Sequence, residues 1–301
     1  MPELPDITVY IDALRTRLEG RALTGSRILS PFLLRTAEPP LESLHGAKVV
    51  GLRRVGKRIA IGFDNGAWLV FHLMIAGRFA WFDAGEAAKP TRQTAALFEF
   101  ESGTLLLREA GSKKRASLHV VPEAQDLRDH DRGGIDVQQT DSETFAETMR
   151  RRNHTLKRAL TDPSILSGIG NAYSDEILHR ARLSPIALTQ KLDDAELLRL
   201  HTACCEILAE WTRRLRQETA ASFPAKVTAF RDGMAVHGRY GKPCPDCGTQ
   251  VQRIRYSSNE TNYCPRCQTE GRLLADRSLS RLLKKDWPRS MDELERRRGR
   301  Q

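Results

Sequence analysis

The first hydrophobic pattern along the chain has the period of an α-helix. Between Pro5 and Gly20, apolar side chains recur three or four residues apart, at Ile7, Tyr10, Ile11, Leu14 and Leu18. Proline near the start and glycine at the end are typical helix boundaries. We therefore expect one helix here, docked by its apolar face.

The pattern then changes to short β-like runs. From about residue 22 to residue 121, segments such as RIAIGF, WLVFHLMI, LFEFESGTLLL and LHVVP are separated by Gly, Asp and Asn. Apolar runs bounded by such turn residues are typical of antiparallel strands. Residues 1–125 are therefore predicted to form a β-sandwich that carries the helix at its N-terminus.

Helical patterns return in the second half of the chain. A polar, glycine-containing stretch predicts a linker at 126–141. Helices are expected at 145–160, 172–181 and 193–215, within a helical domain spanning 142–225. A β-like segment, KVTAFRDGMAVHGRYG, leads into a cysteine-rich region at 226–268, and a basic extension occupies 269–301. The predicted fold class is α+β.

The net charge of the chain favours a polyanionic partner. The 301 residues contain 48 Lys and Arg against 38 Asp and Glu, a formal net charge of +10. Neutralising phosphates releases condensed counterions, so a basic chain favours nucleic acid. No basic segment followed by an apolar run opens the chain, and its most apolar stretch, 68–76, is too short to cross a bilayer. We expect a soluble intracellular protein.

The cysteine pairs CPDC and CPRC predict a metal centre. Each pair places two thiolates on one side of a metal, and the sixteen residues between the pairs suit a β-hairpin. Four thiolates with no open position describe a structural, tetrahedral Zn²⁺ site. The predicted ligands are Cys244, Cys247, Cys264 and Cys267. The hairpin also carries Arg253 and Arg255, which we expect to reach a nucleic-acid groove.

Two glycine-containing segments are candidates for phosphate contacts. In SGIGNAYSDEIL, Gly168 and Gly170 allow a tight turn before a helix, where backbone N–H groups and Asn171 favour an anion. The alternative is a simple helix-capping turn. In RRVGKRIAIGF, Lys57 follows a glycine at the entrance to a strand, where a lysine is ordinarily just solvated.

Together these motifs resemble the formamidopyrimidine-DNA glycosylase / endonuclease VIII family of base-excision repair enzymes. The shared features are PELPD at the N-terminus, GK at Lys57, GIGNAYSDE and the zinc hairpin, in that order. The resemblance implies an N-terminal β-sandwich, a helix-two-turn-helix domain and a zinc finger, with damaged double-stranded DNA bound between the domains. It also implies a cytoplasmic, bacterial-type protein associated with the nucleoid, for which a monomer suffices.

The resemblance further implies the roles of individual residues. After removal of Met1, Pro2 would attack the sugar of the damaged nucleotide, Glu3 would donate protons, and Lys57 would donate protons or contact phosphate. An α-amino group titrates about two units below lysine, so part of it is unprotonated near neutral pH. The DNA-contacting set comprises His72, Ile75, Lys114, Arg115, Lys157, Asn171, Glu176, Arg253, Arg255 and Asn259. The residues themselves leave open that His72 is a core histidine and that Met74, not Ile75, fills the space of the extruded base.

Three departures from the family pattern bear on the substrate. Asn259 stands where family members commonly carry an arginine that binds phosphates. Either Arg253 or Arg255 substitutes for it, or the binding of these phosphates is weaker. The loop EAGSKKRAS lacks the aromatic residue that usually stacks on the orphaned base. The segment that caps 8-oxoguanine is not recognisable in ETAASFPAKVTAF.

The resemblance implies a bifunctional enzyme, a DNA glycosylase that is also an abasic-site lyase and cleaves by β,δ-elimination. Two other functions compete with this one. A tautomerase-like enzyme would also use an N-terminal proline, but it leaves the zinc hairpin without a purpose. A DNA-binding relative that recognises abasic or crosslinked DNA with little excision would fit the altered loops. It would not need a nucleophilic N-terminus.

Overall fold

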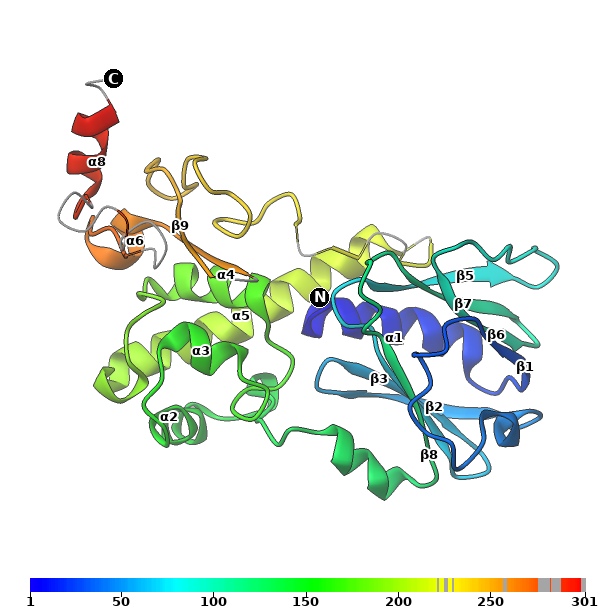
Figure 1. The fold of residues 1–301 in the computed structure, drawn as a ribbon. Helices are drawn as coiled ribbons and strands as arrows, with labels where there is room; N and C mark the ends of the chain where they lie inside the picture. Colours follow the sequence, from blue (N-terminus) through cyan, green and yellow to red (C-terminus); the bar gives the residue numbers. More distant parts are fainter. Residues whose placement is uncertain are drawn as a thin grey trace. The chain divides into compact units, whose positions relative to one another are not determined.

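The computed structural model describes residues 1–220, 222–224, 227–228, 230–256, 259–275, 282 and 288–298 (Figure 1). The chain divides into two compact units. The first contains residues 1–132 and 210–229, and the second contains residues 133–209 and 230–301. No helix among the described residues is long and apolar enough to cross a membrane.

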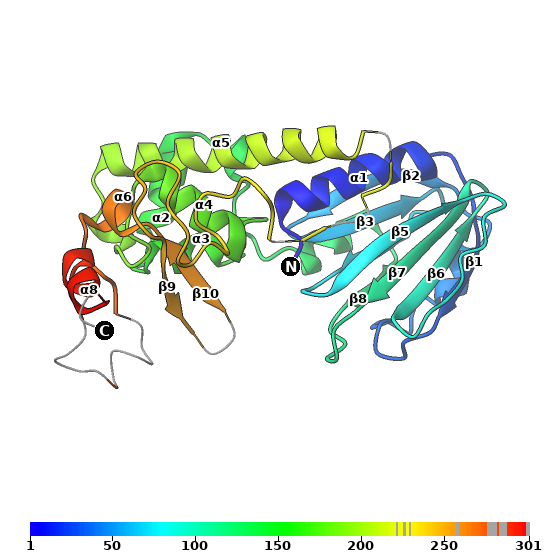
Figure 2. The same cartoon turned by 90° about the horizontal axis from the view of Figure 1, so that it is seen from above.

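The first unit contains the two antiparallel sheets of the predicted sandwich (Figure 2). One sheet has the order β1 (Leu23–Ile28), β6 (Thr94–Phe100), β7 (Gly103–Glu109) and β5 (Gly77–Asp83). The other has the order β2 (Val49–Val55), β3 (Arg58–Phe63), β4 (Trp68–His72) and β8 (Ser117–Val121). Short 3₁₀ helices η1 (Leu41–Leu44) and η2 (Ala124–His130) also belong to this unit.

The predicted N-terminal helix is α1 (Leu4–Leu18), which runs alongside the strands (Figure 2). Its apolar face joins one core with side chains of both sheets, as the helical period predicted. Tyr10 is fully buried and packs edge-on against Phe79, with ring centroids 5.5 Å apart. Burying each such ring removes apolar surface from water and contributes about 1.5–3 kcal/mol. The first residues of the chain are therefore held against the sandwich.

Two turns of this unit present candidate residues. Gly56 adopts a φ of 59° in the two-residue turn between β2 and β3, where a side chain would be strained, and Lys57 is the other turn residue. The turn between β4 and β5 contains Met74, whose φ of 52° is also left-handed. This turn requires glycine at position 77, because a Cβ there would lie only 2.3 Å from the Leu73 carbonyl oxygen.

The second unit opens with helices, and one of them differs from its prediction. The helix expected at 145–160 is two helices, α2 (Ser142–Arg150) and α3 (Leu156–Thr161). At the start of α3 the backbone N–H groups of Leu156 and Lys157 bond to the carbonyls of Ala187 and Pro185 and not to a preceding helical turn. A pairing partner distant in sequence therefore interrupts a continuous helical pattern.

The other helices confirm the predicted pattern. They are α4 (Asn171–Ala181) and α5 (Asp194–Glu218), with the short η3 (Val137–Gln139) and η4 (Thr189–Lys191) nearby in sequence. Helix α5 begins in the second unit, and its residues from Glu210 onward belong to the first. There Arg216 pairs with Asp12 of α1 at 2.8 Å.

The β-like segment predicted at 226–241 is not a strand in any of its described residues, 227–228 and 230–241. The N–H groups of Ala235, Val236 and His237 bond to the carboxylate of Glu176 at 2.7–2.9 Å, so they are not available to a sheet. A buried side chain on α4 thus replaces the expected strand partner.

The cysteine-rich region forms the predicted hairpin. Strands β9 (Gln252–Arg255) and β10 (Glu260–Tyr263) are antiparallel, and α6 (Pro265–Thr269) follows. Leu274, early in the C-terminal extension, packs with Ile254 and Tyr263 of the hairpin, and α8 (Met291–Arg298) ends the described chain. The hairpin tip at 257–258 and, within the basic extension, residues 276–281, 283–287 and 299–301 lie outside the described residues.

Candidate functional site

The N-terminus is built into the first unit. Pro2 is buried, and Glu3 is only 2% exposed at the N-cap of α1. The Glu3 backbone N–H donates to the Asp6 carboxylate at 2.9 Å, while the Glu3 side chain accepts from the backbone of Asp6. This reciprocal capping box orients both acidic residues at the positive end of the helix.

Charged side chains surround the terminal amine. Burial lowers the pKa of the Met1 amino group, and Arg78 and Lys57 lower it further, while Glu3 and Asp6 act in the opposite direction. Arg78 is held by hydrogen bonds to the carbonyls of Val227, Ile75 and Gly77. Two predicted residues from separate parts of the sequence, Glu3 and Lys57, therefore lie close enough to act on the same amine.

His72 belongs to a basic cluster that the sequence did not reveal. It pairs with Arg58 across β3 and β4, and burial lowers its pKa to about 4, with Arg58 and Lys57 adding to the effect. Burial likewise lowers the pKa of His119 to about 4, and the His119 and His130 rings lie 4.7 Å apart. Arg58 also donates to the His130 carbonyl at 2.8 Å. The half-buried position of His72 differs from that of a core histidine.

The two predicted loop elements of this unit are exposed. The side chain of Ile75 is 58% exposed, whereas Met74 is half-buried, so Ile75 is the more accessible apolar residue of its turn. Between β7 and β8, the buried Glu109 carboxylate accepts from the N–H groups of Arg115 and Ala116 at 2.7 and 3.0 Å. The Lys114 ammonium donates to the Glu109 carbonyl. Glu109 thereby organises the basic loop.

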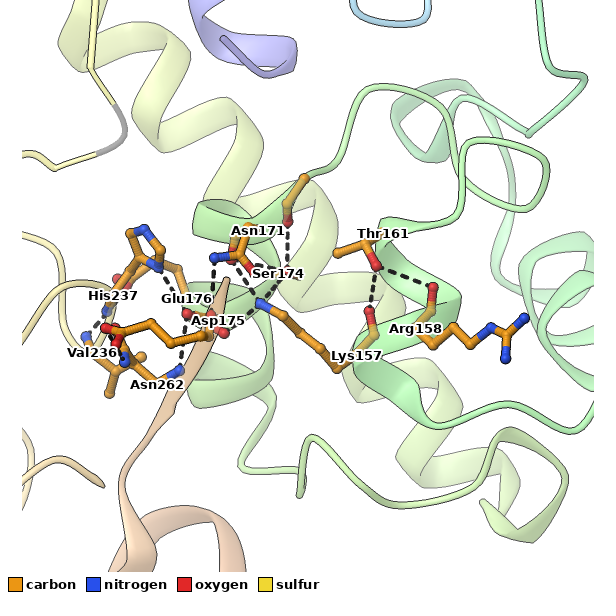
Figure 3. Close-up of polar contacts among 12 residues, drawn as sticks. Lys157, Arg158, Thr161, Asn171, Ser174, Asp175, Glu176, Val236, His237 and Asn262 are labelled. Carbon is orange, nitrogen blue, oxygen red and sulfur yellow. Dashed lines mark hydrogen bonds and ion pairs between the residues drawn. The ribbon is translucent and has the colours of Figure 1, made fainter. Parts of the chain in front are cut away.

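In the second unit, the turn before α4 has the geometry that its glycines predicted. Gly168 has a φ of 86°, and Gly170 is the extended N-cap of α4. Asn171, the first residue of the helix, donates its side-chain N–H to the carbonyl of Glu260 at 3.0 Å. Figure 3 shows Asn171 above the buried polar network described next. The turn is therefore attached to the zinc hairpin.

Lys157 lies inside the protein and not on its surface. Its ammonium donates to the Asn171 carbonyl at 2.7 Å, the Ser174 hydroxyl at 2.8 Å and the Asp175 carboxylate at 2.5 Å (Figure 3). An ammonium has three donors, so these contacts satisfy it. The geometry thus attaches Lys157 to the start of α4, and its contact with DNA stays a prediction.

Asp175 extends this network to the loop beyond α5. Its second carboxylate oxygen accepts from the His237 ring at 2.8 Å and from the Asn262 N–H at 3.1 Å. Burial raises the pKa of Glu176, and its three backbone N–H bonds counter that effect. Both acidic residues are buried, and both join α4 to the 235–238 loop (Figure 3). Glu176 is thus buried and bonded within the unit, and its role in DNA binding stays a prediction.

The hairpin distinguishes the two candidate arginines. Arg253 pairs with Glu260 at 3.1 Å, and its guanidinium lies 4.2 Å from the Tyr240 ring centroid. Arg255 and Asn259 are exposed near the tip, where the Asn259 carbonyl accepts from the Tyr256 N–H. Arg253 is therefore largely occupied within the hairpin, while Arg255 stands at its exposed end.

The four predicted cysteines form the structural zinc site. Their sulfur atoms all lie within 4.8 Å of one another, with Cys244–Cys267 at 3.9 Å and Cys247–Cys264 at 3.4 Å. A tetrahedral site with Zn–S bonds of about 2.3 Å places its sulfurs about 3.8 Å apart, so the arrangement fits Zn²⁺. The His179 ring of α4 lies 3.2 Å from the Cys244 sulfur and connects the site to the helix.

The structure therefore gathers the predicted residues into two groups. Pro2, Glu3, Lys57 and His72 lie in the first unit with Ile75, Lys114 and Arg115, and the remaining residues lie in the second. Sequence reasoning missed Arg58, Asp175 and His237. Only the position of Arg58, next to Lys57, offered a signal, because the other two are recognisable only from their buried partners.

Family comparisons agree with this organisation. The formamidopyrimidine-DNA glycosylase N-terminal domain matches residues 1–114, and the H2TH domain of the same glycosylase matches residues 135–221. A zinc finger found in FPG and IleRS matches residues 241–269. The three matches together span most of the chain.

Individual relatives carry the same family name. The formamidopyrimidine-DNA glycosylase of Pelotomaculum thermopropionicum is 31% identical over 279 residues, covering 89% of this chain and 99% of the relative. An uncharacterized formamidopyrimidine-DNA glycosylase-like protein of Mycobacterium tuberculosis is 41% identical over 151 residues, covering 50% of this chain and 94% of its own.

Solved structures show the same fold. The Lactococcus lactis FPG (MutM) in complex with DNA containing an oxidized pyrimidine has a TM-score of 0.79 at 23% identity, covering 89% of this chain and all of the other. A complex of the Lactococcus lactis Fpg with DNA containing an abasic site also has a TM-score of 0.79, at 22% identity, covering 89% of this chain and 99% of the other. With its three domain matches and full-length relatives, the chain belongs to the formamidopyrimidine-DNA glycosylase family.

Proposed function

We propose that this protein is a DNA glycosylase of base-excision repair that also cleaves abasic sites, with Pro2 as its nucleophile. The observation that carries the proposal is the environment of the N-terminus. In the structure the terminal amine is that of the half-buried Met1, and burial lowers its pKa within reach of the charges of Glu3 and Lys57. The Pro2 amine that removal of Met1 would expose lies next to it in the chain, and we expect it to meet the same charges. An amine needs its lone pair free to attack carbon, and a lowered pKa increases the unprotonated fraction at neutral pH.

The chemistry follows from a secondary amine at position 2. Once Met1 is removed, the Pro2 nitrogen forms a bond to C1′ as the glycosidic bond breaks, and the proton that the nitrogen then loses balances the one that the departing base takes up. Glu3 donates a proton to the sugar ring oxygen, which opens the ring and leaves a cationic iminium at C1′. The iminium acidifies the C2′ proton, whose removal expels the 3′ phosphate. A second elimination expels the 5′ phosphate, and water releases the sugar fragment from Pro2.

The remaining residues have roles in holding DNA. We propose that Lys57 and His72 contact phosphates beside the damaged nucleotide, and that Ile75 enters the space of the extruded base with Lys114 and Arg115. Asn171 would contact phosphate from the second unit. Arg255 is the proposed substitute for the arginine missing at Asn259, because it is exposed near the same end of the hairpin as Asn259.

Borohydride trapping on a duplex with an abasic site tests this function. The wild type is expected to form a covalent complex, because borohydride reduces the iminium to a stable amine. A variant with one additional residue that is not removed before Pro2 is expected to form none, since acylation turns the amine into an amide without a nucleophilic lone pair. Pro5→Ala, which changes the proline in the first turn of α1, is the control and should still be trapped.

Absence of trapping with the wild type would contradict the lyase and favour the DNA-binding alternative. A panel of duplexes with 8-oxoguanine, formamidopyrimidine, an oxidised pyrimidine or an abasic site then identifies the substrate. Because the 8-oxoguanine cap is not recognisable in the sequence, we expect 8-oxoguanine not to be the best substrate of the panel.

A further inference from the structure

Phe230 is an exposed aromatic residue in the second unit that the proposed chemistry does not use. Its side chain is 69% exposed, the highest value among the described aromatic side chains. One face of its ring stacks on the His237 ring, with centroids 5.5 Å apart and an interplanar angle of 16°. An exposed phenylalanine loses contact with water only when a partner covers it, so a fixed, exposed ring is a feature of binding surfaces.

His237 is held rigidly beneath this ring. It is 6% exposed, and its Nδ1 lies 2.8 Å from the Asp175 carboxylate, which is itself paired with Lys157 (Figure 3). Because Asp175 is a pure acceptor when ionised, His237 donates through Nδ1, and its ring plane is set by that bond. The Phe230 ring lies within 16° of the plane of His237.

The backbone around Phe230 leaves room for this stack. Gly238 has a φ of 70°, and a Cβ at this position would lie 2.7 Å from Cδ1 of Phe230. The Glu176 carboxylate fixes the intervening N–H groups of Ala235, Val236 and His237 to α4. Phe230 is therefore presented at a set place relative to the helix that begins with Asn171.

The surrounding charges identify the partner. Residues 230–242 carry Arg231, Arg239 and Lys242 against a single carboxylate, Asp232. A planar aromatic ring in a positive segment fits a base of a nucleic acid, since bases stack on aromatic rings while cations attract the backbone. A nucleobase inside a duplex cannot be reached in this way, but an extruded one can.

We propose that Phe230 is the residue on which the extruded, damaged base stacks, an inference that rests on the proposed glycosylase function. Phe230 is the last residue of ETAASFPAKVTAF, the segment in which the cap for 8-oxoguanine is not recognisable. Stacking is tolerant of base identity because every base has a π-face. Phe230 would thus make this enzyme accept several planar lesions, where a hydrogen-bonding cap would select one.

The experiment compares two reactions of the same variants under single-turnover conditions. One duplex carries formamidopyrimidine-guanine, and the matched duplex carries an abasic site, which has no base to stack. Phe230→Leu removes the ring and keeps apolar bulk, whereas Phe230→Trp keeps a stacking surface. Phe32→Leu alters a ring that is 63% exposed in the first unit and serves as the matched control.

Phe230→Leu is expected to slow base excision about tenfold or more, with abasic-site cleavage unchanged. Phe230→Trp and Phe32→Leu should keep both rates. Excision by Phe230→Leu at the wild-type rate would overturn the inference, as would an equal loss of both reactions, since that pattern indicates a damaged fold. A wild type that cleaves only the abasic duplex would overturn it too, whereas a wild type that cleaves neither duplex contradicts the proposed function itself.

Discussion

At the scale of single residues, burial controls the charge of the basic groups in the first unit. His72 and His119 stand on neighbouring strands, and burial lowers the pKa of each to about 4 from an ordinary value of 6.5. Arg58 and Lys57 act on His72, while His130 and Arg58 act on His119. The histidines are therefore neutral in the free protein at neutral pH. An approaching phosphate would favour their protonated forms.

This lowered pKa predicts a pH-dependent stability. Between pH 6.5 and about 4 the unfolded chain binds more protons at His72 and His119 than the folded one. The free energy of unfolding is thus expected to fall as pH drops through this window. His119→Gln should make the decline shallower in urea denaturation followed by circular dichroism.

The exposed His45 in the same unit provides the control. His45→Gln should reproduce the wild-type pH profile. A profile of His119→Gln that also coincides with the wild type would contradict the role of burial at His119.

The buried ion pair between Lys157 and Asp175 predicts a large loss of stability when the cation is removed. The side chains of Lys157 and Asp175 are 11% and 0% exposed, so Lys157→Met leaves a buried carboxylate without its cation. Breaking a buried pair from one side costs about 3–5 kcal/mol. We expect a loss of this size in the free energy of unfolding by urea. Arg180→Met breaks a surface pair with Glu206 and should cost less than about 1 kcal/mol; equal losses would refute the buried network.

At the scale of elements, α4 joins the parts of the second unit that carry the proposed DNA contacts. Its first residue bonds to β10, its middle residues hold the 235–238 loop, and His179 near its end approaches the zinc site. A metal site closed by four thiolates stabilises a small hairpin whose own core is limited. The zinc is thus coupled to the position of Asn171.

Removal of zinc by a chelator should therefore act locally. Amide hydrogen exchange is expected to accelerate in β9 and β10, while β6 and β7 of the sandwich keep their protection. Affinity for a duplex with an abasic-site analogue should fall, because the Asn171–Glu260 bond loses its support. Uniform acceleration across both units would show that the metal stabilises the chain as a whole.

At the scale of the whole molecule, the net charge of +10 sets the strength of DNA binding. Each phosphate neutralised by a cation releases a counterion and contributes about 0.9 to the slope of log K against log salt. Charges already paired inside the protein contribute less. Arg115 is exposed in a basic loop, whereas Arg253 is paired with Glu260.

We expect Arg115→Gln to reduce the salt slope by about 0.9, measured by fluorescence anisotropy between about 50 and 200 mM salt. Arg253→Gln should change the slope much less. If both variants reduce the slope by the same amount, the pairing of Arg253 does not persist on DNA. If neither differs from the wild type, the loop at Arg115 does not contact phosphates.

Much of this organisation was predictable from the chain. The helical period from Ile7 to Leu18, the strand runs and the cysteine spacing are local patterns, and each yielded the predicted element. The helix expected at 145–160 and the strand expected at 226–241 were wrong for one reason. In both segments the backbone bonds to residues far along the chain, which no local pattern reveals.

The sequence by itself determined the family, the zinc ligands and the candidate nucleophile, because short motifs of distinctive residues carry them. The tertiary structure alone decided which charged residues are buried with partners. It placed Lys157 and Glu176 in a buried polar network, brought Glu3 and Lys57 near one amine, and stacked Phe230 on His237. Burial and pairing depend on contacts between distant segments, and a side chain's chemical type does not specify them.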